Sequence, residues 1–544
     1  MHIRFELQKM LQELVGADAL KVKVERPSSA EHGDYATSIA LALGKQQGIA
    51  PQQAASQLVE KLKAQAHPAI GDISIAGPGF MNLRLSDAWL TAQGVAAAKS
   101  VAGLGKSMLH KGEHAHLEFI SANPTGPLTL ANARGGFLGD VLGNVLQRTG
   151  YKVVREFYVN DRGNQVGVLA ESVLRRYWQQ QGITIDYPET CYQGAYVDEL
   201  ARKLKLANYR MTDVAKIHEI RDKIKDKVVA TMLKEIQRVV TKTMGITFDN
   251  WLSEKALVAS GVLDKLLAKL KDQGMIYEKE GATWLATTKY GDDKDRVLVK
   301  ADGEMAYFLP DIANHWLKFT KHKANVAINI LGADHHGYVA RMRAAMQGLG
   351  FDNAAHQFHP IIIQFVRLLQ DGKEVKMSKR RGTYVEAEEV VEEVGLDAAR
   401  FFFLMYDPNT HLDFNLDAAK AQNEKNPVYY VQYAHARMCS IIAKTKGLPV
   451  AKTPVGVLPA SARRLILELL RWPEVLEDVS RDYGVQRIPQ YALDLARTFH
   501  DFYTNVRVID NEHVQSLPFT LVRGTKNVLA DVLDTLGITA PAHM

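Results

Sequence analysis

A polar loop between two apolar segments carries the first residues that suggest chemistry. The loop, SANPTGPLTLANARGG at residues 121–136, follows the short run HLEFI and precedes an amphipathic run. If it joins a strand to a helix, the free N–H groups at the helix start favour phosphate, and the backbone can approach a ligand at Gly126. The side chains that can donate hydrogen bonds are Ser121, Asn123, Thr125, Thr129 and Asn132. These residue types also make ordinary capped turns, so the loop alone leaves both interpretations open.

A second segment, QDGKEVKMSKRRGTY, concentrates positive charge after another apolar run. Its cations are Lys373, Lys376, Lys379, Arg380 and Arg381, and they surround Met377, Ser378 and Gly382. A basic loop at the end of a strand can offset the charge that develops in a phosphoryl-transfer transition state. The alternative is an ordinary basic surface loop, or a basic cluster of the kind found in localisation signals.

The triplet Asp334, His335 and His336 follows the apolar run NVAINILGAD. Such a triplet suggests a metal-dependent phosphoesterase. No companion carboxylates with convincing ligand spacing accompany it, so we expect no metal ligand here. The two histidines could instead be structural.

The elements that must position these residues follow from the hydrophobic pattern. HAHLEFI and YKVVREFYVN flank the helical run ARGGFLGDVLGNVLQRTG, and this order indicates a βαβ unit with a parallel sheet. NVAINILGAD and FHPIIIQFVRLL are typical of fully buried strands. The polar loop would then lie at the carboxyl edge of a Rossmann-like sheet, where such sheets bind ligands.

Changes of pattern along the chain predict three domains. Residues 1–110 form an N-terminal α/β domain, and residues 111–416 form a Rossmann-like domain with an insertion at about 185–300. Residues 417–544 show helical patterns only and predict an all-α bundle. The stretch 201–242 is helical and basic, with 12 Lys/Arg against 5 Asp/Glu. It is either a solvated helix face or a surface for nucleic acid.

Composition excludes several other classes of protein. The chain has 544 residues, 47% of them hydrophobic, and a net charge of +6, a mild preference for polyanions. Two cysteines exclude a disulfide scaffold and a four-cysteine zinc site. We find no signal peptide and no apolar run that could span a bilayer, so we expect a cytoplasmic protein without a membrane partner.

Taken together, the two charged and polar segments resemble the paired motifs of class I aminoacyl-tRNA synthetases. KMSKR, residues 376–380, matches the second motif intact. The first motif, His-Ile-Gly-His in most members, is replaced by Thr129, Leu130, Ala131 and Asn132. The segments EFISANPTGPL, REFYVNDRGNQV, DGEMAYFLPDIANH, GLDAARFFFL and NPVYYVQYAHAR are similar to bacterial arginyl-tRNA synthetases, in the same order.

This resemblance implies an arginine–tRNA ligase that forms arginyl-adenylate from ATP and transfers arginine to the terminal adenosine of tRNA(Arg). Magnesium accompanies ATP, and family members generally need bound tRNA to activate arginine. Lys376 and Lys379 are expected to offset phosphate charge, with Thr129 and Asn132 as catalytic donors. The remaining ATP-binding residues implied are Ser121, Gly126, Ala131, Asp334, His335, His336, Met377 and Ser378.

The resemblance also implies a pocket for L-arginine and two surfaces for tRNA. Carboxylates are the natural partners of a guanidinium, and Glu118, Asn123, Tyr307 and Asp311 fall at the arginine-binding positions. Read from chemistry alone, Glu118 could face outward from its strand, Asp311 could cap a helix and Tyr307 could be a core aromatic. The tRNA-contacting candidates are Phe80, Asn82, Tyr433, Arg437 and Arg507. We expect a monomer.

Two alternatives remain at this stage. The missing histidines suggest a tRNA-binding paralogue that has lost ATP chemistry, and the class I motifs also allow another class I synthetase. Thr129 and Asn132 are shorter than histidine but still donate hydrogen bonds, and tryptophanyl-tRNA synthetases carry a similar Thr-x-Gly-Asn variant. Ala131 is the less comfortable change, because a methyl group replaces glycine where adenine should approach.

Overall fold

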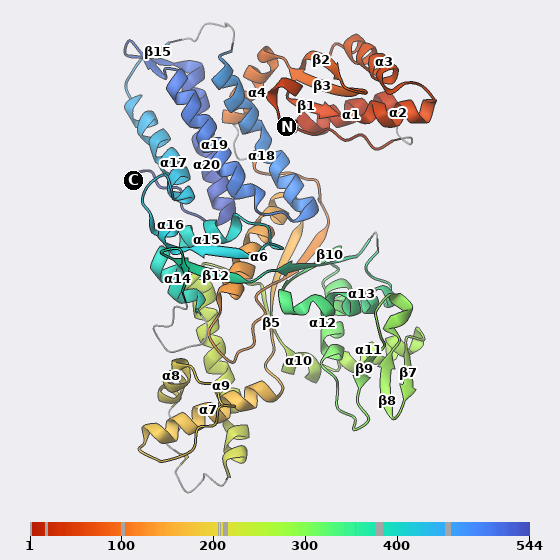
Figure 1. Ribbon diagram of the computed structural model, residues 1–544, viewed down its shortest axis with the longest axis vertical. Coiled ribbons are helices and arrows are strands. Elements are labelled where there is room, and N and C mark those ends of the chain that lie inside the picture. The colour runs from red at the N-terminus through yellow and green to blue at the C-terminus, as the bar shows by residue number, and fades with distance from the viewer. Residues whose placement is uncertain are drawn as a thin grey trace. The chain divides into compact units, whose positions relative to one another are not determined.

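The computed structural model describes residues 3–16, 20–99, 104–204, 206, 208–209, 216–353, 355–375, 385–451 and 458–544. These residues form two compact units (Figure 1). One comprises residues 110–426, and the other combines residues 1–109 with residues 427–544.

A five-stranded parallel sheet organises the unit of residues 110–426. Its strands are β4 (His114–Glu118), β5 (Lys152–Val159), β6 (Asn250–Ser253), β10 (Val326–Gly332) and β11 (Gln357–Ile363). Their order is β11-β10-β4-β5-β6, with Val326 opposite Ala115 and Ala115 opposite Val153. The strand order therefore reverses between β4 and β10, which is the point where open α/β sheets bind ligands. The predicted Rossmann-like fold is confirmed.

Helix α6 (Leu130–Arg148) connects β4 to β5 as the βαβ pattern predicts. It lies very close to the sheet, because a methyl group at Gly139 would come within 2.3 Å of the ring of Phe119. The same is true at Gly143, where a methyl group would lie 2.7 Å from the guanidinium of Arg155. Glycine at these positions fixes the helix against the strands, and with it the helix start beside the sheet edge.

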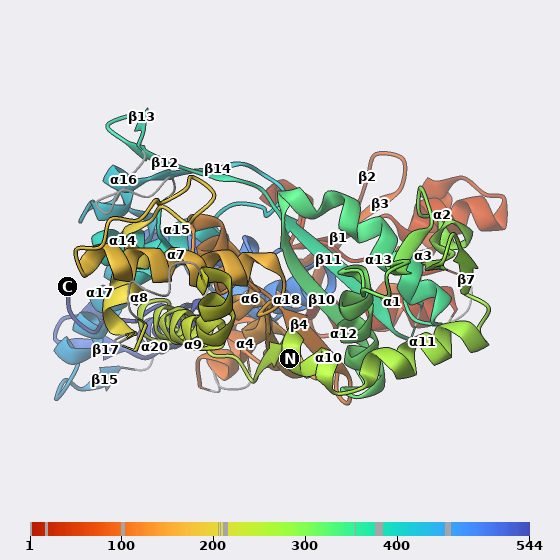
Figure 2. The ribbon, with the colours of Figure 1, turned by 90° about the horizontal axis from the view of Figure 1, so that it is seen from below.

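The predicted strand FHPIIIQFVRLL is two strands in different sheets. The chain leaves the parallel sheet after β11, and Gln364 donates its N–H to the carbonyl of Pro408. The second strand, β12 (Val366–Gln370), pairs with β13 (Lys373–Glu374) and β14 (Leu412–Asn415), and the three run side by side in Figure 2. This small sheet leads directly into the basic segment.

The range predicted as one insertion contains a strand of the central sheet. β6 pairs with β5 through Phe157 and Trp251, so additional structure lies both before and after it. Before β6 come α7 (Asn164–Gln180), α8 (Ala195–Lys203), α9 (Ile217–Arg238) and the π-helical turn η3 (Val239–Thr243). After it come α10 (Glu254–Ala259), α11 (Val262–Asp272), β7 (Ile276–Lys279), β8 (Ala282–Leu285), η4 (Thr287–Tyr290), β9 (Arg296–Val299) and α12 (Phe308–Thr320). The unit is completed by η5 (Ala333–His335), α13 (His336–Gly348), α14 (Ala387–Val394), α15 (Leu396–Leu404) and α16 (Leu416–Lys420).

The main described helix of the basic stretch, α9, has one buried face. Ile217, Ile220, Ile224 and Val228 of α9 are buried, and α9 packs against α7. Several of its lysines pair with acidic neighbours, such as Lys223 with Glu219 at 2.6 Å. This arrangement favours the solvated-face interpretation over a dedicated nucleic-acid surface.

The second unit joins an α/β part to a helical part. The α/β part contains α1 (Ile3–Val15), η1 (Ala30–His32), β1 (Tyr35–Thr37), α2 (Ile39–Gln47), α3 (Pro51–Ala64), β2 (Ile70–Ala76), β3 (Phe80–Leu85) and α4 (Asp87–Lys99). The helical part contains α17 (Pro427–Lys444), α18 (Ala460–Asp482), α19 (Arg487–Asn505) and α20 (Ser516–Leu536). Helix α4 packs on α18 and α20, and Arg463 of α18 forms ion pairs with Asp34 and Asp87.

The helical part also carries a small sheet that the sequence analysis did not expect. Its strands are β15 (Val450–Ala451), β16 (Ile509–Asp510) and β17 (His513–Gln515), and they are too short to leave a hydrophobic period. The predicted C-terminal helical region is otherwise confirmed. Among the described helices, none combines the length and apolar character that crossing a bilayer requires.

Candidate active site

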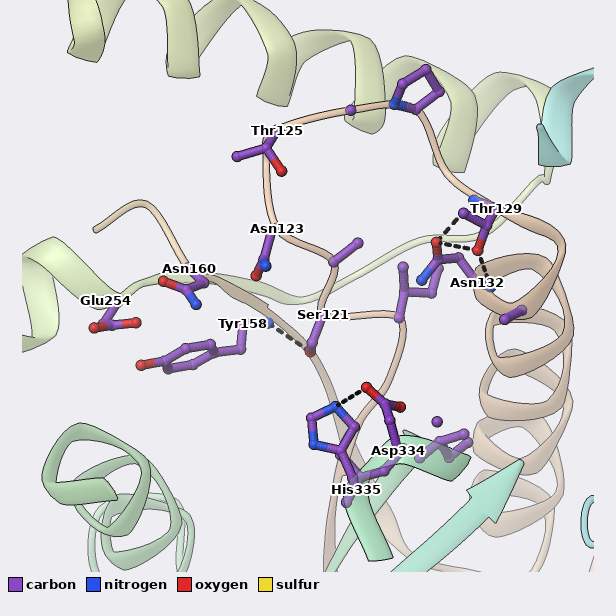
Figure 3. A pocket seen from close by; sticks show the side chains of 18 of the residues that line it. Ser121, Asn123, Thr125, Thr129, Asn132, Tyr158, Asn160, Glu254, Asp334 and His335 are labelled. Carbon is purple, nitrogen blue, oxygen red and sulfur yellow. Dashed lines mark hydrogen bonds and ion pairs between the residues drawn. The ribbon is translucent and has the colours of Figure 1, made fainter. Parts of the chain in front are cut away.

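A pocket of about 940 Å³ opens where the strand order reverses between β4 and β10. Its wall combines the loop after β4, the start of α6, the end of β10 and the first turn of α12 (Figure 3). The predicted site residues that line it are Glu118, Ser121, Asn123, Gly126, Thr129, Ala131, Asn132, Tyr307, Asp311, Asp334 and His335. Residues that were assigned separately to ATP and to arginine therefore share one cavity, large enough for two small ligands.

The loop after β4 has a strained backbone. Ile120 and Ser121 have φ angles of 65° and 41°, in the left-handed region that β-branched residues rarely adopt. The Ser121 hydroxyl holds this turn, since it donates to Glu118 at 3.2 Å and accepts from the Tyr158 N–H at 3.1 Å. Strain of this kind concentrates at functional sites. Ser121 therefore shapes the pocket floor.

Thr129 and Asn132 form a reciprocal cap at the start of α6. Oδ1 of Asn132 accepts from the N–H and the hydroxyl of Thr129, each at 2.9 Å, while the N–H of Asn132 donates to the Thr129 hydroxyl at 3.4 Å. These bonds fix which end of the amide is oxygen, and they turn Nδ2 of Asn132 toward the pocket (Figure 3). The two residues thus keep the helix start ordered and still offer a donor.

The same loop is tied to the chain that follows the basic segment. Thr129 forms an isolated β-bridge with Glu386, and the N–H of Ala387 donates to the carbonyl of Leu128 at 2.8 Å. Glu386 itself lines the pocket. Lys376, Met377, Ser378 and Lys379 lie outside the described residues, but the chain returns from them to the pocket at Glu386.

Glu118 is buried and already has a cationic partner. Lys318 of α12 and Asn314 both donate to its Oε2, the latter at 3.0 Å, and Lys318 also donates to Asn329. Burial opposes ionisation of Glu118, but the Lys318 ammonium outweighs it and holds the pKa of Glu118 below its usual value. Glu118 is therefore an ionised group of the pocket at neutral pH, with its charge largely balanced.

Asp311 and Glu254 carry the unbalanced negative charge of the pocket. Burial, together with the nearby charges of Glu118 and Glu254, raises the pKa of Asp311 to about 7. Burial also raises the pKa of Glu254, whose nearest ion pair is a distant one to Arg162 at 3.9 Å. Arg341 and Lys318 lower the pKa of Asp311, but burial and the two neighbouring carboxylates outweigh them. A further cation in the pocket would favour the ionised form of Asp311.

Tyr158, Asn160 and Glu254 were missed by the sequence analysis although they line the pocket. Oδ1 of Asn160 is buried without a hydrogen-bond partner in the described part of the chain, and the Tyr158 hydroxyl interacts with the Glu254 carboxylate. Figure 3 shows them close to Glu254 and facing the same space as Asn123. Glu254 starts a helix after a short strand, a position that normally indicates only a favourable helix start.

Two predicted arginine-binding residues lie at the rim. Tyr307 is 68% exposed, and a methyl group at Gly163 would lie 2.9 Å from its hydroxyl. Nδ2 of Asn123 donates to Gln165 at 2.8 Å. The core-aromatic interpretation of Tyr307 is wrong, since a core side chain would not be exposed.

Asp334 and His335 occupy the end of β10 beside the loop. Nε2 of His335 lies 3.6 Å from Oδ2 of Asp334, and its ring packs edge-on against Tyr338. His336 begins α13, and its side chain lies outside the described residues. This edge of the sheet is where the nucleotide part of a ligand would lie.

The predicted tRNA contacts differ in accessibility. Phe80 and Tyr433 are 42% and 47% exposed, Arg437 lies over the Tyr503 ring, and the exposed Arg507 pairs weakly with Asp510. Asn82 requires a correction. It is only 7% exposed, although Phe80 on the same face of β3 is exposed, and it lies between Ala36 and Ser74 of the neighbouring strands. It is therefore poorly placed to present a contact.

Comparisons with known proteins agree along the whole chain. Residues 1–85 match the family described as "Arginyl tRNA synthetase N terminal domain", residues 99–434 match "tRNA synthetases class I (R), catalytic domain", and residues 431–544 match "DALR anticodon binding domain". The arginine–tRNA ligase of Desulfitobacterium hafniense is 43% identical over 96% of this chain and 93% of its own length. That of Shouchella clausii is 41% identical over 96% and 94%.

Solved structures show the same similarity. A putative arginyl-tRNA synthetase from Campylobacter jejuni has a TM-score of 0.74 and 33% identity, and it covers 85% of this chain and all of its own. The arginyl-tRNA synthetase of Thermus thermophilus has a TM-score of 0.79 over the full length of both chains at 23% identity. Because the sequence identity to the Thermus thermophilus protein is only 23%, that comparison supports the fold alone.

Proposed function

This chain belongs to the arginyl-tRNA synthetase family, and we propose how its pocket binds the reactants. The protein charges tRNA with arginine, with ATP as the substrate that supplies the energy. A tRNA-binding paralogue without ATP chemistry is not favoured, because the full-length relatives are ligases.

The observation that carries the proposal for arginine is the charge imbalance around Asp311. An incoming guanidinium supplies the missing cation, and its planar donors match carboxylate oxygens. Asp311 and Glu254 take the guanidinium, and the Tyr158 hydroxyl beside Glu254 and the unpartnered Asn160 oxygen complete its surroundings. Glu118, Asn123 and Tyr307 position the rest of the amino acid along the pocket wall.

The proposal for ATP rests on the start of α6. Nδ2 of Asn132 and the free N–H groups of the first turn face the phosphates, and Ser121, Gly126 and Thr129 form the loop beneath them. We assign Ala131, Asp334, His335 and His336 to binding of the nucleoside. Mg²⁺ would accompany the phosphates and offset their charge.

The chain's residues then position two group transfers. The arginine carboxylate attacks the α-phosphorus of ATP, so that arginyl-adenylate forms and pyrophosphate leaves. A ribose hydroxyl of the terminal adenosine of tRNA next takes the arginyl group, and AMP leaves. Lys376 and Lys379 offset the charge that develops on the phosphates, with Met377 and Ser378 between them.

The remaining proposals concern organisation. We divide the chain into a tRNA-contacting domain at residues 1–110, a catalytic domain at 111–416 and an anticodon-binding domain at 417–544. Phe80, Tyr433, Arg437 and Arg507 contact tRNA(Arg), since each offers an exposed ring or guanidinium. The protein acts as a monomer in the cytoplasm.

Isotope exchange between ATP and pyrophosphate tests the activation step. With arginine and tRNA(Arg) present we expect exchange well above background, and little exchange when either is omitted. Lysine in place of arginine should give no exchange, because a single ammonium cannot satisfy the several acceptors around Asp311. Exchange that proceeds equally well with lysine would contradict the assignment of the pocket to a guanidinium.

The raised pKa of Asp311 predicts a pH dependence of arginine binding. Arginine stays cationic throughout, whereas Asp311 loses its charge below about pH 7, so affinity falls as the pH falls. We expect the Kd for arginine to be about tenfold higher at pH 6 than at pH 8, as one proton must leave before binding. Equilibrium dialysis with labelled arginine measures this. A flat profile would mean that Asp311 has an ordinary pKa and does not face the ligand.

A further inference from the structure

A cluster of potential metal ligands lies away from the pocket residues used above. His116 is in β4, Glu156 is in β5, and His322 is in the segment between α12 and β10. One ligand atom of each lies within 4.8 Å of the others. Nε2 of His116 is 3.5 Å from Oε2 of Glu156, and the His116 and His322 rings are 5.1 Å apart.

The two strand residues, His116 and Glu156, are buried, and some of their polar atoms lack a hydrogen-bond partner within the described ranges. His116 and Glu156 are each 1% exposed. Both ring nitrogens of His116 and Oε1 of Glu156 have no hydrogen-bond partner within the described ranges. Buried polar atoms are nearly always bonded, so an unpartnered set that converges on one point indicates a missing group.

We propose that His116, Glu156 and His322 bind a divalent transition metal, and that zinc suits them best. Two imidazoles and one carboxylate are a known zinc ligand set. Zinc bonds of about 2.0–2.1 Å in tetrahedral geometry separate neighbouring ligand atoms by roughly 3.4 Å, close to the separation of His116 and Glu156. His322 is half-buried and gives the ion a route from solvent, with water as the fourth ligand.

The surroundings support an ion at this position. Nδ2 of Asn250 donates to Oε2 of Glu156 at 2.6 Å and orients the carboxylate, as the neighbours of metal ligands commonly do. Lys318, a nearby cation, is held by Glu118 and Asn329, so its charge is already balanced. The metal would fasten the segment after α12 to β4 and β5, where Asn325 already bonds both polar backbone groups of His114. We assign it a structural role, because none of its three protein ligands lines the pocket.

Metal content of the full-length protein tests the proposal. The chain is stripped with a chelator, dialysed against zinc chloride and then against buffer, and its zinc is measured by mass spectrometry. We expect about one equivalent per chain and a higher Tm with zinc than without it. His322→Asn should lower the retained zinc at least tenfold and abolish the Tm difference, because it removes a ligand from the accessible side.

The matched control is His218→Asn, which removes a histidine beside a single carboxylate, Glu171 at 3.7 Å. That variant should retain zinc like the wild type. His116→Asn should lose zinc as well. Because His116 is buried, that variant could fail to fold, and the zinc content of His322→Asn is then the decisive measurement. Absence of retained zinc in the wild-type chain would overturn the proposal, and so would unchanged zinc in His322→Asn.

Discussion

Replacing Asp311 by Asn is expected to raise the KM for arginine by about two orders of magnitude or more while it stabilises the fold. Removing one partner of a desolvated charge pair costs about 2–5 kcal/mol, and each 1.4 kcal/mol is about tenfold in affinity. Asn keeps the shape of Asp311 but cannot balance a guanidinium. Arginine-dependent ATP–pyrophosphate exchange measures the change in KM.

The stability effect has the opposite sign, which separates loss of binding from loss of structure. The pKa of Asp311 is raised to about 7 in the folded chain, above its ordinary value, so its ionised form opposes folding. Ionisation of Asp311 therefore lowers the free energy of unfolding by its full amount above about pH 7, and it has no effect at pH values below the ordinary carboxyl pKa. Asp311→Asn should therefore have a higher Tm than the wild type at pH 8, and the difference should shrink as the pH falls.

A neutral ligand and a second variant act as controls. Citrulline has the shape of arginine without its charge, so wild-type affinity for arginine should far exceed that for citrulline, and Asp311→Asn should reduce the difference. Asp161→Asn removes a carboxylate whose two oxygens accept from Ser253 and the Lys255 N–H at the start of α10. Its KM should change by less than about twofold. An equal rise of the KM for arginine in both variants would show that Asp311 acts only by adding to the net negative charge of the region, and not by contact with the guanidinium.

The sequence predicted the parts of this site that depend on local pattern. The polar loop and α6 follow each other in the chain, so their geometry could be inferred from strand, turn and helix signals. Glu118 was identifiable as a charge inside an apolar strand. The Asp311–Tyr307 spacing indicated one helical turn, and both residues do line the pocket.

Features that depend on contacts across the chain were not predictable in this way. Glu254 reaches the pocket because β6 joins the sheet, and a four-residue strand within a predicted insertion gives almost no signal. Lys318 reads as an ordinary polar position of an amphipathic helix, although it is fully buried against Glu118. The break between β11 and β12 depends on Gln364, whose backbone partner lies in a later segment. Asn82 is buried on the otherwise exposed face of β3, between β1 and β2, and the sequence pattern does not show which strand of this sheet is central.

Asn132→Asp is expected to reduce arginine-dependent ATP–pyrophosphate exchange by about 10²–10³-fold without loss of stability, the size of effect seen when one donor to a developing charge is removed. The carboxylate still accepts from Thr129, so the cap of α6 survives, and negative charge near a helix start is favourable. What disappears is the Nδ2 donor, and an anion replaces it where the phosphates bind. Tm should therefore be unchanged or higher. The Kd for tRNA should stay within about twofold, because the tRNA contacts proposed above belong to other segments of the chain.

Asn132→Ala distinguishes the two functions of this residue. It removes both the donor and the cap acceptor, so exchange should fall as in Asn132→Asp, but Tm should also fall, since a lost cap costs about 1 kcal/mol. If Asn132→Asp instead retained activity within about threefold of the wild type, the Nδ2 group would have no role in activation. Thr129 and Asn132 would then serve only to order the helix, and the N–H groups of its first turn would bind the phosphates unaided. A large loss in both variants with a Tm decrease only in Asn132→Ala would identify the short amide as the functional replacement for the imidazole that most class I enzymes carry.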